Sequence, residues 1–301
     1  MMIQPNQQKV EETSSEEEAA LFNSDTLSKI ISFLPSVNLL SLSLTCKGFG
    51  IPVSNNPLEL SLIEESARIA VKDIATEEQL AALPHYDGES SLADYHYLQL
   101  MREPLTFDQL CAGVKYVNSG DKTSVMHSGD RNSTWGTAFS NNIMRAGKHY
   151  VSFVFDSIYN NIYVGVMRPG QANQNAKGSP IHKDFFQHFS RTHVEHYNGS
   201  VLHCCLYGAY DGKCYTRDWD SDIAARGSWD GLESASSSDE LGLLLDLDEG
   251  SLSVYKNGRK LGVMKKGLAG NYCLAGPYCW VVSMVPEVTN VTIKRGVIPP
   301  G

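Results

Sequence analysis

The chain contains no long hydrophobic run. None of its apolar stretches approaches the roughly 18 uncharged residues from which a helix could cross a bilayer. Its N-terminus also lacks a basic segment followed by an apolar one, which is the pattern of a secretory signal. We therefore expect no membrane partner, and a cytoplasmic or nuclear location.

Basic stripes are missing as well. Lys and Arg number 25 against 34 Asp and Glu, which gives a net charge of −9. Affinity for DNA or RNA depends on neutralising backbone phosphates. The composition therefore predicts no nucleic-acid partner.

Cysteine pairs with redox or metal-binding spacing are also absent. The chain has seven cysteines, an odd number, and no Cys-x-x-Cys motif. Both observations favour reduced thiols over a disulfide framework. Several histidines from His182 onward precede Cys204 and Cys205, but their spacing matches no common zinc motif, and neighbours in a strand point to opposite faces. We expect no metal and no cofactor.

Sequence motifs of catalysis are lacking. The chain has no G-x-S-x-G, no Walker loop and no G-x-G-x-x-G followed by a helix. An enzyme would need several titratable residues converging in one pocket, and no such set is visible. We therefore expect that the protein is not an enzyme and has no catalytic residues.

Residues 1–20 are rich in glutamate among Gln, Ser and Thr. Such a composition cannot bury enough apolar surface to fold. It predicts a disordered acidic tail.

Residues 21–50 carry more apolar side chains than so short a segment can bury. The first half predicts a helix, because apolar residues recur at the i, i+3, i+4 and i+7 spacing of one helix face. These residues are Leu27, Ile30, Ile31 and Leu34. Pro35 ends this helix and Ser36 can begin the next. Since the segment cannot form an independent core, its surplus apolar surface must be covered by the rest of the chain or by another protein.

The same stretch resembles an F-box. The matching positions are Leu21, Asp25, Leu27, Ile30, Phe33-Leu34-Pro35, Leu39, Leu40, Leu42, Leu44 and Cys46-Lys47-Gly48-Phe49. One departure is Phe22, where the family usually has proline. The resemblance, over residues 21–56, implies docking onto the Skp-type adaptor of a cullin ubiquitin ligase. The adaptor-binding residues it implies are Leu27, Ile30, Ile31, Leu34, Pro35, Leu39 and Leu40.

Residues 57–111 are expected to form a helical linker. Thr76 followed by Gln79 fits a capping box. Leu92, Tyr95 and Leu98 are spaced like one face of a helix. No chemistry is indicated in this segment.

From residue 112 to residue 297 the period changes from helix to strand. Val151, Phe153 and Phe155 alternate with their neighbours, as the buried face of a strand does. Asn257-Gly258 between two apolar segments is a strong signal of a hairpin turn. Many short strands with frequent turns predict an antiparallel β-sandwich or barrel, followed by a short tail at 298–301.

This region resembles a SPRY domain. The resemblance is carried by Trp135-Gly136, Gly147-Lys148-His149-Tyr150, Tyr163-Val164-Gly165-Val166, Leu241 to Asp248, Tyr255-Lys256-Asn257-Gly258, Leu261-Gly262 and Tyr278-Cys279-Trp280. It implies a bent β-sandwich that binds a target protein or peptide through its loops. Trp, Tyr and Arg are the residues that most often dominate binding energy. The candidates in or beside the loops are Tyr159, Arg168, Tyr215, Arg217, Trp219 and Trp229.

The sequence thus predicts an α+β multidomain chain, with an F-box-like helical hairpin and helical linker ahead of an antiparallel sandwich. Proteins of similar plan are substrate receptors of ubiquitin ligases, with adaptor, cullin scaffold and target as partners. The alternative is a non-enzymatic interaction scaffold whose helical hairpin packs on its own linker. The exposure of Leu27, Ile30 and Leu34 distinguishes the two.

Overall fold

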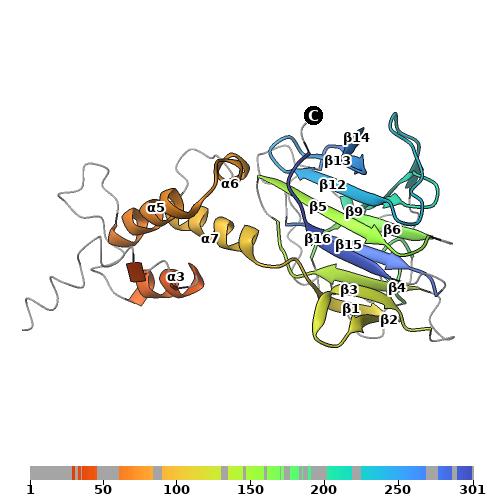
Figure 1. Cartoon of the computed structure of the whole chain (residues 1–301). Coiled ribbons are helices and arrows are strands. Elements are labelled where there is room, and N and C mark those ends of the chain that lie inside the picture. The colour runs from red at the N-terminus through yellow and green to blue at the C-terminus, as the bar shows by residue number, and fades with distance from the viewer. Residues whose placement is uncertain are drawn as a thin grey trace, which may run out of the picture. The chain divides into compact units, whose positions relative to one another are not determined.

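The computed structural model describes residues 29–30, 33–34, 36–45, 61–83, 90–129, 135–144, 147–158, 161–169, 171–172, 177–182, 185, 189–190, 202–218, 225–268, 277–286 and 290–299. The chain divides into two compact units, Met1–Glu103 and Pro104–Gly301. Figure 1 labels most of the helices and strands of these units.

The first unit is helical in its described part. Its helices are α3 (Ser36–Thr45), α5 (Leu62–Ile74), α6 (Glu77–Ala82) and α7 (Ser91–Arg102). Side-chain caps begin the last three helices, at Ser61, Thr76 and Ser90. Thr76 and Gln79 form the predicted capping box, in which each side chain satisfies a backbone N–H of the other. The start of α6 was therefore readable from the sequence.

The core of this unit lies between α5 and α7. Leu92, Tyr95 and Leu98 form the buried face of α7, as their spacing predicted, and they pack with Ile63 and Ala67 of α5.

One carboxylate adds a polar link between the same two helices. The Glu64 carboxylate of α5 accepts hydrogen bonds from Ser90 Oγ at 2.6 Å and from the Leu92 N–H at 3.3 Å. It therefore caps the N-terminus of α7, where a negative charge is favourable.

The second unit is an antiparallel β-sandwich. One sheet has the order β1-β4-β15-β6-β9-β10-β11 and the other β14-β13-β12-β5-β16-β3-β2. The strands of the first sheet are β1 (Phe107–Ala112), β4 (Gly136–Ser140), β15 (Cys279–Met284), β6 (Ile162–Met167), β9 (Leu202–Gly208), β10 (Cys214–Asp218) and β11 (Ala225–Gly227). Those of the second are β14 (Arg259–Lys266), β13 (Ser251–Lys256), β12 (Glu240–Asp246), β5 (Lys148–Phe155), β16 (Val291–Arg295), β3 (Asp121–His127) and β2 (Val114–Asn118). A separate short pair joins β7 (Gln171–Ala172) and β8 (Phe189–Ser190).

The sheet begins earlier than the residue 112 expected from the sequence. β1 starts at Phe107, inside the expected helical linker, and its register shifts between Phe107 and Gln109. The shift breaks the period-two alternation of apolar residues, which is the signal by which a strand is recognised. The helical segment accordingly ends with α7 at Arg102.

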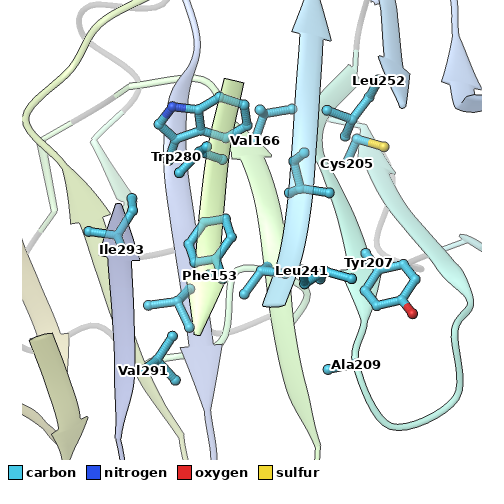
Figure 2. Packing of buried hydrophobic residues seen from close by; sticks show 14 of the residues in the cluster. Phe153, Val166, Cys205, Tyr207, Ala209, Leu241, Leu252, Trp280, Val291 and Ile293 are labelled. Atoms are coloured by element: carbon cyan, nitrogen blue, oxygen red, sulfur yellow. The ribbon is translucent and has the colours of Figure 1, made fainter. Parts of the chain in front are cut away.

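The core of the sandwich is filled from both sheets. Figure 2 shows Phe153, Leu241 and Ile293 of one sheet projecting toward Val166, Cys205 and Trp280 of the other, and all six belong to one buried cluster. Val151, Phe153 and Phe155 are buried, as their alternation predicted. Trp280 is among the largest fully buried side chains of the chain.

The predicted hairpin turn is present between β13 and β14. Asn257 and Gly258 have φ values of 51° and 76°, as a turn that fits the twist of two antiparallel strands requires. Asn257 Oδ1 accepts from the Glu240 N–H at 2.9 Å, and its Nδ2 donates to Asp239 Oδ1 at 2.8 Å. The Asn257 side chain thus fixes the turn to the start of β12.

Candidate protein-interaction surfaces

Arg168, a predicted target contact, lies inside the second unit. It follows β6, its side chain is 2% exposed, and its guanidinium carbon lies 5.0 Å from the centre of the Tyr278 ring. Its backbone N–H donates to His203 O at 3.0 Å, which continues the pairing of β6 with β9. The cation–π contact is favourable in such a desolvated place. In this position Arg168 packs against the interior of the second unit, at the end of β6.

Tyr215 and Arg217 of β10 are also buried. Arg217 Nη1 donates to Ile181 O at 2.8 Å and so ties the 177–182 segment to the sheet.

Trp229 is partly buried and closes the core beside a turn. Its Nε1 donates to Gly212 O at 2.7 Å, and its ring stands edge-on to Tyr207 at 6.5 Å. Buried Trp side chains find such polar partners because the indole N–H must be satisfied. Trp229 thus holds the segment after β11 against the turn that follows β9.

Tyr159 and Trp219 lie outside the described residues. Direct contact of the six candidates with a target stays a prediction. The loop context was readable from the sequence, but burial was not, because it depends on which segments fold over these side chains.

A row of aromatic side chains leads across the first sheet to a charged pair. Trp135 stacks on Tyr163 at 5.5 Å, and Tyr163 meets Tyr215 edge-on at 4.8 Å. Arg226 of β11 then lies over the Tyr215 ring, with its guanidinium carbon 5.6 Å from the ring centre. Such pairs are favourable beyond their buried area.

Asp211 holds the charged end of this row together. Its Oδ2 accepts from Tyr215 OH at 2.7 Å and from Arg226 Nη2 at 2.6 Å, and its Oδ1 accepts from the Lys213 N–H at 3.1 Å. Burial by itself raises the pKa of Asp211, but these hydrogen bonds outweigh it and hold the pKa below its usual value. Burial, followed by the neighbouring Asp211 carboxylate, raises the pKa of Tyr215. At neutral pH the carboxylate is therefore charged and the phenol neutral.

Replacing Asp211 by asparagine is expected to make the free energy of unfolding depend less steeply on pH in the acidic range. Because the native pKa is depressed, Asp211 stabilises the fold above the unfolded-state value of about 3.9 and loses that effect as pH falls through the lower native pKa. The measurement is the urea unfolding free energy of both proteins from neutral pH down to strongly acidic pH. Equal slopes for Asp211→Asn and the wild type would contradict the role of this carboxylate.

An exposed surface adjoins this cluster. Tyr210, in the turn between β9 and β10, is 62% exposed, and Leu232 is exposed as well. The segment that carries Leu232 packs on this turn, since the Ala235 N–H donates to Ala209 O at 2.8 Å. Arg226 keeps about half of its side chain in water. Tyr and Arg at the edge of a rigid sheet are suited to protein recognition.

Sequence reasoning missed Tyr210, Leu232 and Arg226 as surface residues. The Ala-Tyr-Asp-Gly sequence at 209–212 is a turn signal and could have placed Tyr210 at a tip. Leu232 and Arg226 carried no comparable signal.

In the first unit, the predicted adaptor-binding residues differ in how much of each side chain is exposed. Ile30 is exposed and Leu34 is partly buried, whereas Leu39 is completely buried among α5 and α7 residues. Leu39 and Leu42 lie three residues apart on α3 and face the core of their own unit. Leu39 is therefore a core residue rather than a free contact. Leu27, Ile31, Pro35 and the Leu40 side chain lie outside what the structure describes.

Two other apolar side chains of this segment are highly exposed. Phe33 is 85% exposed at a turn closed by its N–H, which donates to Ile30 O at 3.1 Å, and Leu44 of α3 is 79% exposed. Isolated exposed apolar residues are common. Exposed apolar side chains of this size, together with the exposed Ile30, are candidate contacts for a partner protein.

Buried thiols are a further feature of the second unit. Burial raises the pKa of Cys111 and of Cys279 to about 12. Because the thiolate is the nucleophile and the metal ligand, these two cysteines behave at neutral pH as small apolar core residues.

In the described part of the chain, no group of three or more His, Cys, Asp or Glu side chains is placed to hold a metal ion. Among the same residues, no helix has the length and hydropathy of a membrane span.

No family model matches the sequence, and neither does any curated protein. Among solved structures, the chain is similar to the SPRY domain of human HERC1, with 16% identity and a TM-score of 0.40 over 61% of this chain and 94% of that one. It is similar to the PSpry domain of TRIM65, with 16% identity and a TM-score of 0.42 over 66% and 97%. It is also similar to the NEUZ (NHR) domain of Neuralized from Drosophila melanogaster, with 12% identity and a TM-score of 0.36 over 64% and 93%.

Proposed function

We propose that this chain is a substrate-recognition subunit of a cullin-type ubiquitin ligase. In this role the F-box-like segment binds a Skp-type adaptor, and the sandwich binds a target protein through its loops. The chain performs no chemistry itself. It holds the target near a ubiquitin-charged enzyme and so raises the effective concentration of the reacting groups.

The exposure of Phe33 and Leu44 is the observation that carries the adaptor half of this proposal. Burying a side chain of this kind is worth about 1.5–3 kcal/mol. Association of two proteins costs roughly 4–15 kcal/mol in lost translational and rotational freedom. These two residues and Ile30 therefore supply a substantial share of the free energy that an adaptor contact needs.

The target half is supported by the surface around Tyr210, Leu232 and Arg226. This surface lies beside strands that are held in a continuous sheet. Binding there therefore costs little conformational entropy. Tyr210 offers a large apolar contact at low conformational cost, and Arg226 offers a charge held in place by Asp211.

The proposal is tested by reconstitution with purified components. The full chain, mixed with a Skp-type adaptor and a cullin, is expected to co-elute with them as one complex in size-exclusion chromatography. Affinity purification from the native cell, followed by mass spectrometry, should recover the same subunits together with a target. Failure to form the complex at micromolar concentrations would contradict the ligase role.

The alternative is a scaffold without ligase partners, and two contacts favour it. Leu39 is buried in the core of its own unit, and Leu34 O accepts from Gln99 Nε2 of α7 at 3.1 Å. Part of the F-box-like surface is thus already covered by the helices that follow it. Recovery of target proteins without adaptor or cullin would support this second function.

A further inference from the structure

Two cysteines on neighbouring strands touch inside the sandwich. Cys205 lies on β9 and Cys214 on β10, and their sulfur atoms are 3.9 Å apart. Both thiols are free, and both side chains belong to the buried cluster between the two sheets, where Figure 2 labels Cys205. The chain between them forms the turn that carries the exposed Tyr210. Two thiols in contact at the base of one turn are placed for a crosslink.

The strand register explains why these two side chains meet. Cys205 pairs with Thr216, and Cys214 pairs with Tyr207. The two cysteines are therefore diagonal neighbours on the same face of the sheet, which is an offset that side chains can bridge. Their contact follows from the register of β9 with β10 and does not require a special loop conformation.

The other described cysteines lie on a different face. Cys204 is adjacent to the pair in sequence, but successive residues of a strand point to opposite sides. It therefore belongs to a second buried cluster, which also contains Cys111 and Cys279. Cys46 and Cys273 lie outside the described residues. The strand geometry thus selects one partner for each thiol of the pair.

The two thiols differ in acidity and in access to water. The hydrogen bond with the Cys205 thiol lowers the pKa of Cys214, burial opposes this effect, and the positive charge of Lys265 lowers the pKa further. The same contact, followed by burial, raises the pKa of Cys205. Cys214 also keeps 7% of its surface exposed, against 0% for Cys205. Because the thiolate is the reactive form, Cys214 is the nucleophile of the pair.

The strand outside Cys214 is short. β11 has 3 residues, all of them exposed, and Gly227 of β11 pairs with Cys214. A strand with so few pairs opens locally at low cost in free energy. A small oxidant such as a hydroperoxide can therefore reach Cys214 while the sandwich stays folded.

We propose that Cys205 and Cys214 form a redox modification site, at which a hydroperoxide converts the two thiols into a disulfide. The Cys214 thiolate attacks one oxygen of hydrogen peroxide, so that an S–O bond forms, the O–O bond breaks and hydroxide leaves. The Cys205 sulfur then attacks the resulting sulfenic acid, the S–S bond forms, and the S–O bond breaks with loss of a second hydroxide. Each hydroxide takes up one thiol proton. The two thiols lose two electrons, and the peroxide is reduced to two molecules of water.

The bond is expected to be strained and therefore reversible. Diagonal neighbours have Cα atoms about 7–8 Å apart, whereas disulfides usually join Cα atoms about 4.4–6.8 Å apart. β9 and β10 must consequently move closer together around Cys205 and Cys214 when the bond forms. A strained disulfide is more easily reduced than a relaxed one. This property distinguishes the proposed site from a permanent crosslink.

The bond also stiffens the turn between the two strands. A crosslink at the base of a loop removes open conformations of that loop. The turn is joined to a later segment, because Ala209 O accepts from the Ala235 N–H at 2.8 Å and Gly212 O accepts from Trp229 Nε1 at 2.7 Å. We therefore expect slower backbone hydrogen exchange across residues 206–213 in the oxidised protein.

The test is peptide mapping of the full chain after oxidation in the folded state. The protein is treated with dilute hydrogen peroxide, the remaining thiols are alkylated, and trypsin digests the product without reductant. Trypsin cuts after Lys213 and Arg217, so the two cysteines fall on different peptides, 192–213 and 214–217. We expect these peptides to appear as a linked pair, lighter than their sum by two hydrogen atoms. The linked pair should be lost when the folded, oxidised protein is treated with dithiothreitol before digestion.

Matched variants assign the bond to its two sulfurs. Cys205→Ala and Cys214→Ala should each abolish the linked pair of peptides. Cys204→Ala removes a buried thiol from the adjacent position on the other face and should leave the linked pair in place. Circular dichroism checks that each variant is folded. Fragmentation of the wild-type linked peptides distinguishes Cys204 from Cys205 without any substitution.

Three results would overturn the proposal. Absence of the linked peptides from folded, peroxide-treated protein would mean that the pair is an inert part of the core. A link through Cys204 in place of Cys205 would contradict the register from which the pair is inferred. Unchanged hydrogen exchange across residues 206–213 after oxidation would show that the bond does not act on the turn. Neither adaptor nor target is used, so failure here is separate from failure of the ligase role.

Discussion

Replacing Phe33 and Leu44 together by aspartate is expected to abolish adaptor binding while the melting temperature stays unchanged. Both side chains are mostly in water, so the folded chain loses little packing when they are shortened. If both are buried against an adaptor, each contributes about 1.5–3 kcal/mol, which corresponds to an affinity loss of roughly 100-fold or more. Calorimetry with purified adaptor measures the affinity, and circular dichroism measures the stability.

The control for this pair is Val297→Asp in the second unit. Val297 is 68% exposed, so the variant places one aspartate, against two in the tested pair, at a similarly accessible apolar position. We expect this variant to bind adaptor like the wild type. Leu39→Ala is a poorer probe, because Leu39 is buried and its truncation would destabilise the helical unit by about 2–5 kcal/mol, which confuses a loss of folding with a loss of binding. Unchanged affinity of the Phe33→Asp, Leu44→Asp protein would favour the scaffold.

Truncating Trp280 to alanine is expected to destabilise the sandwich severely. Trp280 is fully buried between the two sheets (Figure 2), and substitutions of this kind cost about 3–5 kcal/mol. For a unit of this size the melting temperature should fall by roughly 6–20 °C. Differential scanning calorimetry of the full chain measures the shift.

Tyr210→Ala provides the comparison for Trp280→Ala. Tyr210 is also a large aromatic residue of the second unit, but most of its surface is in water. Its removal should leave stability nearly unchanged, within about 0.5 kcal/mol, and should weaken capture of a target. A large loss of stability in Tyr210→Ala would instead make it a structural residue of the β9–β10 turn.

Local signals in the sequence predicted the elements well where neighbours along the chain decide the structure. The capping box at Thr76, the buried face of α7 and the hairpin turn at Asn257-Gly258 are all formed as expected. Each depends on residues a few positions apart, so its physical cause is contained in a short segment. The start of β1 was not predicted, because a register shift removed its alternation.

The candidate site was less predictable, because burial of a loop residue depends on segments far away in the sequence. Arg217 is covered because it bonds Ile181 O, and Trp229 because its N–H reaches Gly212 O. Their residue types suggested binding, and in the fold both side chains also hold loops in place. Leu39 and Leu44 show within one helix that residue type does not predict burial. Leu39 packs against α5 and α7, whereas Leu44 is exposed to water.

The sequence by itself determined the class of the chain: a helical segment ahead of an antiparallel β unit, with a hairpin turn where Asn257-Gly258 requires one. Tertiary structure decided which apolar and cationic residues remain at the surface. Phe33, Leu44 and Tyr210 are exposed, while Arg168, Arg217 and Leu39 are buried. The physical reason is that periodicity is local, whereas exposure is fixed only when distant strands and helices pack together.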